Sequence, residues 1–323
     1  MSDPLENLPN DYPVELTPPD ISPHRDGTDG IPYVHTFDAG APGPHVAISA
    51  IVHGNEPVGA IVLDRFLHEG VRPVRGRLSL AFVNVAAHEA FDAADPNASR
   101  WVDEDFNRLW SPEILDGDRD SVELARAREI RPWLDTVDLL LDIHTMQHRT
   151  APLMMAGPAD KGLELARAVG VPEIVVRDAG HAAGPRMRDY AGFVDPASTR
   201  NALLVECGQH WEAGAEACAF DASVRFLRAT GAVGADFGDA WTSGEPGRQR
   251  TLEITHRVTI ETDTFAFADT FVGLDHIPKA GTVFANDGGT ELRTPYDDCI
   301  LIMPSKRLWK GQTAVRLGRF VDD

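Results

Sequence analysis

Short apolar runs alternate with amphipathic segments over the first 240 residues. Seven short apolar runs predict strands, at 33–37, 46–52, 78–84, 137–143, 153–156, 174–176 and 202–206. Four segments with helical spacing of apolar positions predict helices, at 58–69, 122–133, 161–169 and 213–229. The runs at 47–52, 137–143 and 202–205 are almost continuously apolar, as expected for strands whose sheet is covered by helices on both faces. This alternation predicts a three-layer α/β fold.

The pattern changes after the turn-forming segment 244–247 (Gly-Glu-Pro-Gly). Apolar or aromatic residues there share one parity with polar residues between them, at Leu252, Ile254, His256, Val258 and Ile260. Period two is typical of strands. Because residues 1–30 are rich in Pro, Asp and Gly, we expect an irregular N-terminal arm at 1–30. An α/β domain at 31–243 and a small C-terminal β domain at 244–323 would follow.

The composition of the chain indicates which classes of molecule it is expected to bind. The 323-residue chain has a formal net charge of -20, which opposes binding to nucleic acid or to an anionic membrane. Its three cysteines are widely spaced and form no Cys-x-x-Cys pair, so neither a disulfide framework nor a thiolate zinc site is indicated. The first residues lack a basic region followed by an apolar stretch, and no apolar run approaches eighteen residues. We expect a cytoplasmic protein that acts on a small molecule or a peptide.

Polar residues with suitable chemistry follow three of the central strands. In open α/β sheets, functional sites collect outside the carboxyl ends of the strands. The first strand leads into His53, Gly54, Asn55 and Glu56, which offer an imidazole and a carboxylate three positions apart. The second ends in His144. Two imidazoles and one carboxylate can hold zinc and leave a position open for water.

Two further carboxylates accompany these candidate ligands. Asp142 precedes His144 by two positions, hence on the same strand face, where it can accept the other ring proton and fix the tautomer. A zinc hydrolase also needs a base that is not a ligand, to take a proton from water and return it to the leaving group. Glu206, at the end of the third strand, is the candidate for this base. Glu56 is the alternative, although its spacing from His53 favours ligation.

The segment 100–110 (Arg-Trp-Val-Asp-Glu-Asp-Phe-Asn-Arg-Leu-Trp) supplies candidate substrate-binding groups. A guanidinium matches a carboxylate with two parallel hydrogen bonds, and a second one can polarise a carbonyl. Arg100, Asn107 and Arg108 are therefore candidates for a substrate clamp. The chain has no Gly-x-Ser-x-Gly and no Gly-x4-Gly-Lys-Ser/Thr sequence, which argues against an α/β-type serine hydrolase and a P-loop enzyme.

Four motifs occur in a fixed order along residues 45–210. They are His53-Gly54-Asn55-Glu56, Asp103-Glu104-Asp105-Phe106-Asn107-Arg108, Asp142-Ile143-His144-Thr145 and Glu206-Cys207-Gly208. Together they resemble the ordered signatures of the succinylglutamate desuccinylase/aspartoacylase family, a branch of the zinc carboxypeptidase-like enzymes. The resemblance implies a zinc-carboxypeptidase-like α/β domain with a mixed, largely parallel central sheet, and an appended β domain. Phe106 departs from the leucine that is usual in the family.

The resemblance also implies roles for the candidate residues. One zinc ion (Zn2+) per chain would be held by His53, Glu56 and His144, with Glu206 as general base and then general acid. By the same resemblance, Arg100 would polarise the scissile carbonyl, while Asn107 and Arg108 would hold a substrate carboxylate. The implied reaction is hydrolysis of the amide bond of an N-acyl amino acid or a related small N-acyl amine. Arg186, Arg200 and Tyr296 match too loosely for a role to be assigned.

Two other functions remain open from the sequence. A zinc carboxypeptidase acting on peptide C-termini would use the same metal and arginine geometry. A non-catalytic metal-binding module belongs to a different class, and Glu206 and Arg100 argue against it because a binding site needs neither. The sequence leaves open the acyl group, amide against ester preference, and a homo-oligomer formed through the β domain.

Overall fold

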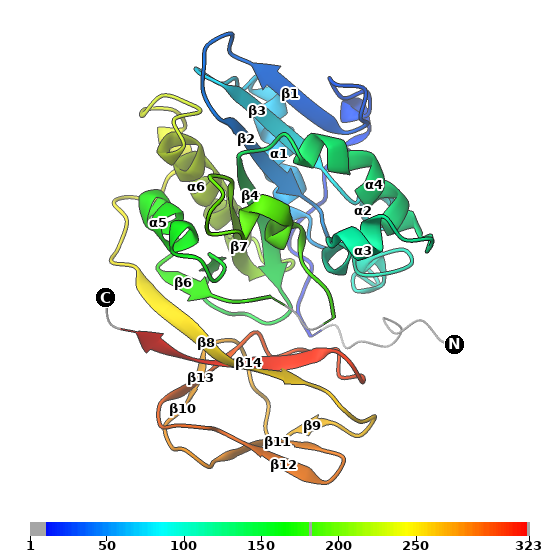
Figure 1. The fold of residues 1–323 in the computed structure, drawn as a ribbon, viewed down its shortest axis with the longest axis vertical. Coiled ribbons are helices and arrows are strands. Elements are labelled where there is room, and N and C mark those ends of the chain that lie inside the picture. The colour runs from blue at the N-terminus through cyan, green and yellow to red at the C-terminus, as the bar shows by residue number, and fades with distance from the viewer. Residues whose placement is uncertain (1–10, 181–182, 322–323) are drawn as a thin grey trace.

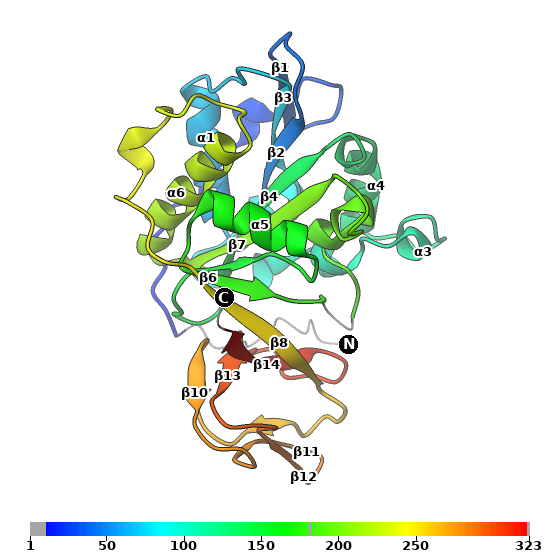
Figure 2. The same ribbon diagram turned by 60° about the vertical axis from the view of Figure 1, so that its left-hand side comes forward.

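A computed structural model describes residues 11–180 and 183–321 (Figures 1 and 2). Its strands are β1 (Val34–Asp38), β2 (His45–Ala50), β3 (Arg77–Phe82), β4 (Leu139–Met146), β5 (Leu153–Met155), β6 (Ile174–Arg177), β7 (Asn201–Gln209), β8 (Arg250–Thr259), β9 (Ala266–Phe267), β10 (Asp275–Ile277), β11 (Val283–Asp287), β12 (Thr290–Arg293), β13 (Cys299–Ile302) and β14 (Thr313–Val321). Its α-helices are α1 (Val58–His68), α2 (Val85–Glu89), α3 (Pro112–Leu115), α4 (Val122–Leu134), α5 (Asp160–Val169) and α6 (Gly214–Ala229). Short 3-10 helices are η1 (Ser22–His24), η2 (Ala98–Arg100), η3 (Phe106–Arg108), η4 (Met187–Asp189), η5 (Ala191–Phe193) and η6 (Asp239–Trp241).

The central sheet is mixed, as predicted, and the pairings among β1–β7 are largely parallel. In the described residues an eleven-stranded sheet has the order β1-β3-β2-β4-β7-β5-β6-β8-β14-β13-β10. β2 pairs in parallel with β3 and β4, and β4 pairs in parallel with β7. β5 is antiparallel to β7 but parallel to β6. The carboxyl ends of β2, β4 and β7 therefore lie at one edge of the sheet.

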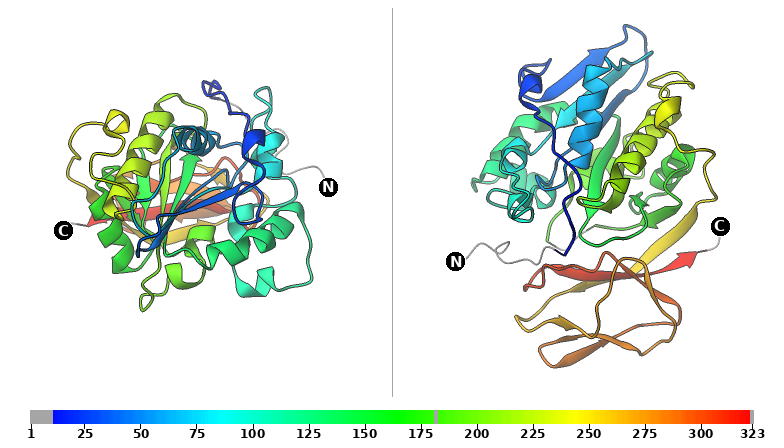
Figure 3. Two further views of the ribbon diagram at one scale, coloured as in Figure 1. Left: turned by 90° about the horizontal axis from the view of Figure 1, so that it is seen from above. Right: turned by 180° about the vertical axis from the view of Figure 1, so that it is seen from behind.

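Helices cover both faces of this sheet, which gives the predicted three layers (Figure 3, left). α1, α5 and α6 pack on one face, in a core that includes Ile48 of β2 and Phe66 of α1. α4 and η3 pack on the other face, in a core that includes the neighbouring Ala47 and Trp133 of α4. Consecutive residues of β2 thus point into different cores, which is why its sequence is apolar without alternation.

Every predicted strand and helix forms, with ends within three residues of the expected positions. The pattern missed α2 and α3 because helices of five and four residues contain too few turns for apolar periodicity. No helix in the described ranges is long and apolar enough to span a membrane.

The C-terminal segment is built from antiparallel strands. β8 pairs with β14, and β14 with β13, while β12, β11 and β9 form a separate three-stranded antiparallel sheet. β8 also pairs in parallel with β6, so the large sheet continues from the α/β layers into this segment. We propose domains at 31–243 and 244–323, with residues 11–30 as an arm whose one regular element is η1. The rest of the predicted arm, 1–10, and the last two residues of the predicted β domain, 322–323, lie outside the described residues.

The expected alternation at 252–260 changes phase inside β8. Leu317 and Gly318 of β14 pair with His256 and Ile254, so Thr255 is an extra residue in a β-bulge. As a result His256 is exposed, although its parity predicted that it would share a face with buried Leu252.

Candidate metal centre and active site

The first two predicted ligands, His53 and Glu56, lie in the turn between β2 and α1. Both side chains are buried, and Nδ1 of His53 lies 2.7 Å from Oε1 of Glu56. The turn packs tightly against neighbouring backbone: a Cβ at Gly54 would lie 2.2 Å from the carbonyl carbon of Ala87 and 2.4 Å from the carbonyl oxygen of Ser99. Only glycine therefore fits at position 54, directly after the first predicted ligand.

His144 completes the group from β4. Its Nδ1 lies 3.0 Å from Oε2 of Glu56, so each of the two imidazoles contacts a different oxygen of the same carboxylate. The backbone N–H of Thr145 donates to the same Oε2 at 2.9 Å. One potential ligand atom from each of His53, Glu56 and His144 lies within 4.8 Å of the others, and all three residues are buried. Two nitrogen donors and one carboxylate fit a divalent metal of the zinc type.

Each of the two imidazoles has a carboxylate behind it. Nε2 of His144 lies 2.9 Å from Oδ2 of Asp142, and the other oxygen of Asp142, Oδ1, accepts a hydrogen bond from Ser49 Oγ at 2.7 Å. Nε2 of His53 lies 3.1 Å from Oδ1 of Asp105. An outer carboxylate of this kind holds the ring proton on Nε2 and leaves the Nδ1 lone pair for a metal, as Asp142 does at His144. At His53, Asp105 favours a proton on Nε2, whereas the donor Nη2 of Arg100, 2.7 Å from the same nitrogen, opposes it. Asp142 was expected in this position from its spacing, whereas Asp105 was not identified because it is distant in sequence from His53.

Charge within this group follows from burial and mutual contact. Burial opposes charge on His144, but the carboxylates of Asp142 and Glu56 outweigh it and raise the pKa of this imidazole. Burial also opposes ionisation of Glu56, yet His53 and His144 hold the pKa of its carboxyl well below the usual value. Glu56 is therefore a carboxylate at neutral pH, as a metal ligand must be.

Glu206 lies beside His144, because the two residues pair in register on the parallel strands β4 and β7. Its side chain is buried, and its Oε2 has no hydrogen-bond partner in the part of the chain that the structure describes. Burial raises the pKa of the Glu206 carboxyl to about 8, with Glu56 adding to the shift and His144 opposing it. A buried carboxyl with an unpaired oxygen and a pKa near neutrality is suited to proton transfer.

The predicted clamp residues line the same pocket. Nη2 of Arg100 lies 2.7 Å from Nε2 of His53 and donates to Asp105 Oδ2 at 3.2 Å. Nη2 of Arg108 lies 3.7 Å from the same Asp105 oxygen. Oδ1 of Asn107 accepts a hydrogen bond from the backbone N–H of Met187 at 2.7 Å, which directs the amide nitrogen of Asn107 away from that contact.

Residues that were not assigned from the sequence also line the pocket, among them Arg186, His210, Arg307 and Arg316. Arg186 forms ion pairs with Asp178 and Asp189, and Arg316 forms one with Asp178. His210 lies 2.8 Å from Thr145 Oγ1, and burial lowers the pKa of its imidazole to about 3.

Arg307 differs from the other arginines of the pocket. It lies in the loop between β13 and β14, and within the described residues its guanidinium has no hydrogen bond and no ion pair. Burial, and then the positive charge of Arg100, lower the pKa of Arg307 well below its usual value. No sequence pattern marks this residue, because the packing of a distant loop against the strand ends brings it to the pocket.

Tyr296 and Arg200 do not line this pocket. The hydroxyl of Tyr296 contacts Thr255 Oγ1 on β8. Arg200 donates to the backbone carbonyls of Val137 at 2.9 Å and Leu134 at 2.8 Å. Of the three loosely matched residues, Arg186 alone lines the pocket.

Comparison with known proteins agrees with this geometry. Residues 42–226 match the family model described as the Succinylglutamate desuccinylase/Aspartoacylase catalytic domain, a span that contains His53, Glu56, His144 and Glu206. No curated protein sequence matches the chain.

Solved structures share the fold at low sequence identity. Succinylglutamate desuccinylase from Vibrio cholerae superposes with a TM-score of 0.67 at 17% identity, over 90% of this chain and 89% of that one. An aspartoacylase family protein from Mesorhizobium loti gives a TM-score of 0.61 at 18% identity, over 93% of each chain. Murine aminoacylase 3 gives 0.58 at 19% identity, over 87% of this chain and 96% of that one. The likeness extends through the C-terminal β segment.

Proposed function

The chain belongs to the succinylglutamate desuccinylase/aspartoacylase family, and from this premise we propose that it is a zinc-dependent hydrolase that deacylates an N-acyl amino acid or a related small N-acyl amine. The observation that carries the proposal is the buried group of His53, Glu56 and His144 in one pocket with Glu206. Two structurally similar proteins are named a desuccinylase and an aminoacylase, which favours deacylation over the cleavage of peptide C-termini.

His53, Glu56 and His144 would hold one zinc ion through two Nδ1 atoms and one carboxylate. The contact at His144 supports this assignment, because Asp142 lies at its Nε2 and would keep the ring proton there. At His53, Asp105 would favour the same tautomer. When bound, zinc lowers the pKa of a water molecule and polarises a carbonyl oxygen.

Glu206 would accept the proton of the attacking water and return it to the leaving nitrogen. Its Oε2, which has no hydrogen-bond partner among the described residues, is available for this purpose. Because the pKa of about 8 lies near neutral pH, the Glu206 carboxyl can both accept and donate a proton there. Glu206 would have a lower pKa beside a bound divalent cation, which would favour its base form before the reaction. Proton transfer by a positioned carboxylate contributes about 10²- to 10⁴-fold to such a rate.

Positive groups around the pocket would orient an anionic substrate. Arg100 lies next to His53 and would stabilise the negative charge that develops on the scissile carbonyl oxygen. Asn107 and Arg108 would hold the carboxylate of the amino acid. Arg307 forms no ion pair with a carboxylate of the described residues, so we assign it to a second negative group of the substrate.

The experiment is a release assay on zinc-loaded protein. A panel of N-acetyl and N-succinyl amino acids is incubated with the protein, and the free amino acid is quantified, with Glu206→Gln as the matched inactive control. A parallel panel of unmodified peptides reports release of C-terminal residues. We expect turnover in the first panel. Turnover restricted to the peptides would establish a carboxypeptidase instead, and stoichiometric zinc without hydrolysis in either panel would establish a binding module.

A further inference from the structure

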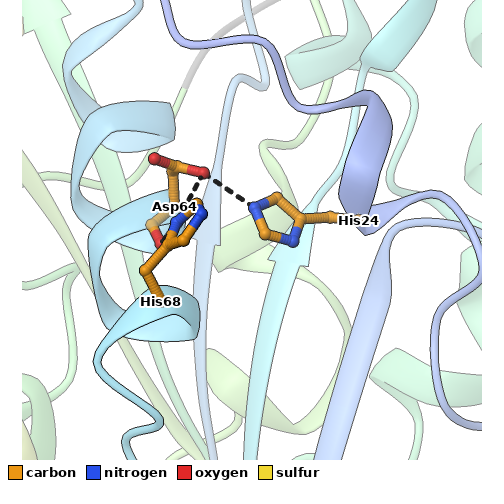
Figure 4. A group of neighbouring side chains, drawn as sticks. All are labelled: His24, Asp64 and His68. Atoms are coloured by element: carbon orange, nitrogen blue, oxygen red, sulfur yellow. Dashed lines mark hydrogen bonds and ion pairs between the residues drawn. The ribbon is translucent and has the colours of Figure 1, made fainter.

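A second group of metal-ligand side chains lies at the opposite end of α1 from the candidate active site. Figure 4 shows His24, from η1, pointing across to α1, where Asp64 and His68 lie one turn apart. Oδ1 of Asp64 lies 2.8 Å from Nε2 of His24 and 3.2 Å from Nδ1 of His68. One potential ligand atom from each residue lies within 4.8 Å of the others. α1, about 16 Å long, starts at Val58, two residues after Glu56, and ends at His68.

The spacing of these atoms is close to that of a bound ion. Bonds of about 2.0–2.1 Å in a tetrahedral site place neighbouring ligand atoms about 3.3 Å apart. The distances of 2.8 and 3.2 Å therefore need only a slight opening of the group. The same contraction is seen between His53 and Glu56, at 2.7 Å, in the group already proposed to hold zinc.

His24 is held in a ligand-like orientation by its surroundings. Its ring stacks on Phe82, with centroids 5.6 Å apart and an interplanar angle of 8°, and it meets His35 edge-on at 5.8 Å. The backbone carbonyl of His24 lies 2.8 Å from Nε2 of His35. Because the ring is fixed and its side chain is 11% exposed, Nε2 points at Asp64 with little rotamer freedom left to lose on binding.

The other two side chains provide access from solvent. Asp64 and His68 lie on one helix face because they are four positions apart, and their side chains are 24% and 63% exposed. In the absence of metal, Nδ1 of His68 can donate to the carbonyl oxygen of Asp64, which lies 2.9 Å away. A metal ion would replace that proton and use the lone pair.

We propose that His24, Asp64 and His68 form a second metal site, selective for a divalent transition-metal ion of the zinc type. Two imidazole nitrogens and one carboxylate disfavour calcium and magnesium, which take oxygen ligands. Water would fill the remaining position, because three protein ligands leave a tetrahedral site open. An ordinary ion-pair cluster would keep the same contacts but would bind no metal.

Such a site would join the N-terminal segment to the helix that follows Glu56. In Figure 3 (right), residues 11–30 run beside α1 and α6 toward η1. The segment is also attached at its other end, where the backbone N–H of Glu15 donates to the carbonyl of Trp211 at 2.9 Å. A metal ion that binds only the folded chain stabilises it by mass action, so occupancy of this site raises the melting temperature.

The first test is the zinc stoichiometry of tag-free protein that has been stripped with a chelator. We expect two equivalents of zinc per wild-type chain, and one equivalent for His68→Gln, whose exposed side chain can be changed without disturbing the core. Asp64→Asn, an isosteric change, should give the same loss. The matched control is His276→Gln: His276 lies 2.8 Å from Asp298 in an exposed pair, with no third ligand among residues 11–180 and 183–321, so this variant should keep two equivalents.

The second test is the melting temperature as zinc is added beyond the first equivalent. We expect a rise for wild type and His276→Gln, and none for His68→Gln or Asp64→Asn. One equivalent in wild type that both site variants retain, or two equivalents in both site variants, would overturn the second site. Neither outcome bears on the deacylase proposal, because His53, Glu56 and His144 are unchanged in every variant.

Discussion

His144 and Glu206 occupy paired positions on the adjacent parallel strands β4 and β7, so a proposed metal ligand and a proposed base lie side by side in the sheet. Neighbouring strands lie about 4.8 Å apart, and residues in register point to the same face. The backbone hydrogen bonds of β4 and β7 thus set the separation of the two groups. This arrangement fixes what should happen when either group is altered.

Replacing Glu206 by glutamine should abolish proton transfer and keep the metal. The side chains are nearly isosteric, so His53, Glu56 and His144 remain in place. We expect kcat to fall by about 10²- to 10⁴-fold with an unchanged affinity for the first equivalent of zinc. Steady-state kinetics and metal analysis of the same preparation check this. A kcat near that of wild type would remove Glu206 from the mechanism.

Replacing Asp142 by asparagine should weaken the metal site without removing a ligand. Asparagine can present an N–H to Nε2 of His144, which favours the wrong tautomer of the ring. We expect zinc affinity to fall by about 10- to 100-fold, measured by competition with a chromophoric chelator. The control is Ser49→Ala, which removes a hydrogen bond to Asp142 and leaves the carboxylate at His144. An equal loss in both variants would point to general disorder of β4.

Replacing Arg307 by methionine should change substrate recognition more than chemistry. The guanidinium lines the pocket but contacts none of the proposed metal ligands. We expect KM to rise by about 10- to 100-fold for substrates with two negative groups, corresponding to about 1.4–2.7 kcal/mol, with a much smaller effect on singly charged ones. Arg307→Lys should recover part of the affinity. Arg293→Met, at an exposed pair with Glu291, serves as the control. Equal effects on both substrate classes would contradict the assignment.

The raised pKa of Glu206 makes the metal-free protein less stable as pH rises. From its ordinary value of 4.5 up to about 8, the unfolded chain releases this proton while the folded chain retains it. Since the folded state then binds more protons, the free energy of unfolding falls with pH over this window. Glu206→Gln removes the effect. With both proteins stripped of metal, the melting temperature of the variant minus that of wild type should increase between pH 5 and pH 8. A constant difference across this range would show that the carboxyl titrates normally.

Gly54 should not tolerate alanine. Its Cβ would lie 2.2 Å from the backbone of Ala87, and backbone on both sides of the turn must shift to accept it. Overpacking of this kind costs about 1–3 kcal/mol or more. We expect a lower midpoint in urea unfolding and weaker zinc binding, because the turn holds both His53 and Glu56. The matched control is Gly214→Ala, at the start of α6, where a Cβ meets nothing within 4 Å and alanine favours the helix. Its midpoint should stay the same or rise.

The strand ends were predictable from the sequence because apolar runs and their terminal polar residues are local patterns. His53, His144 and Glu206 each follow such a run, and parallel strands bring their carboxyl ends together. Asp105 and Arg307 were not predictable in the same way. Each comes from a segment without periodicity, and its position depends on how that segment packs against the sheet. The exposure of His256 was missed for a related reason, because one extra residue in β8 reverses the alternation.

The loop between β13 and β14 places a proposed substrate-binding residue in a different part of the chain from the proposed catalytic residues. The residues proposed for bond cleavage lie within 53–206 and are fixed by the central strands and turns, whereas Arg307 reaches the same pocket from a surface connection more than a hundred residues later. Loops accept substitutions and changes of length more readily than packed strands do. Exchanging residues 303–312 for those of a relative is therefore a route to new substrate preferences on an intact hydrolytic centre.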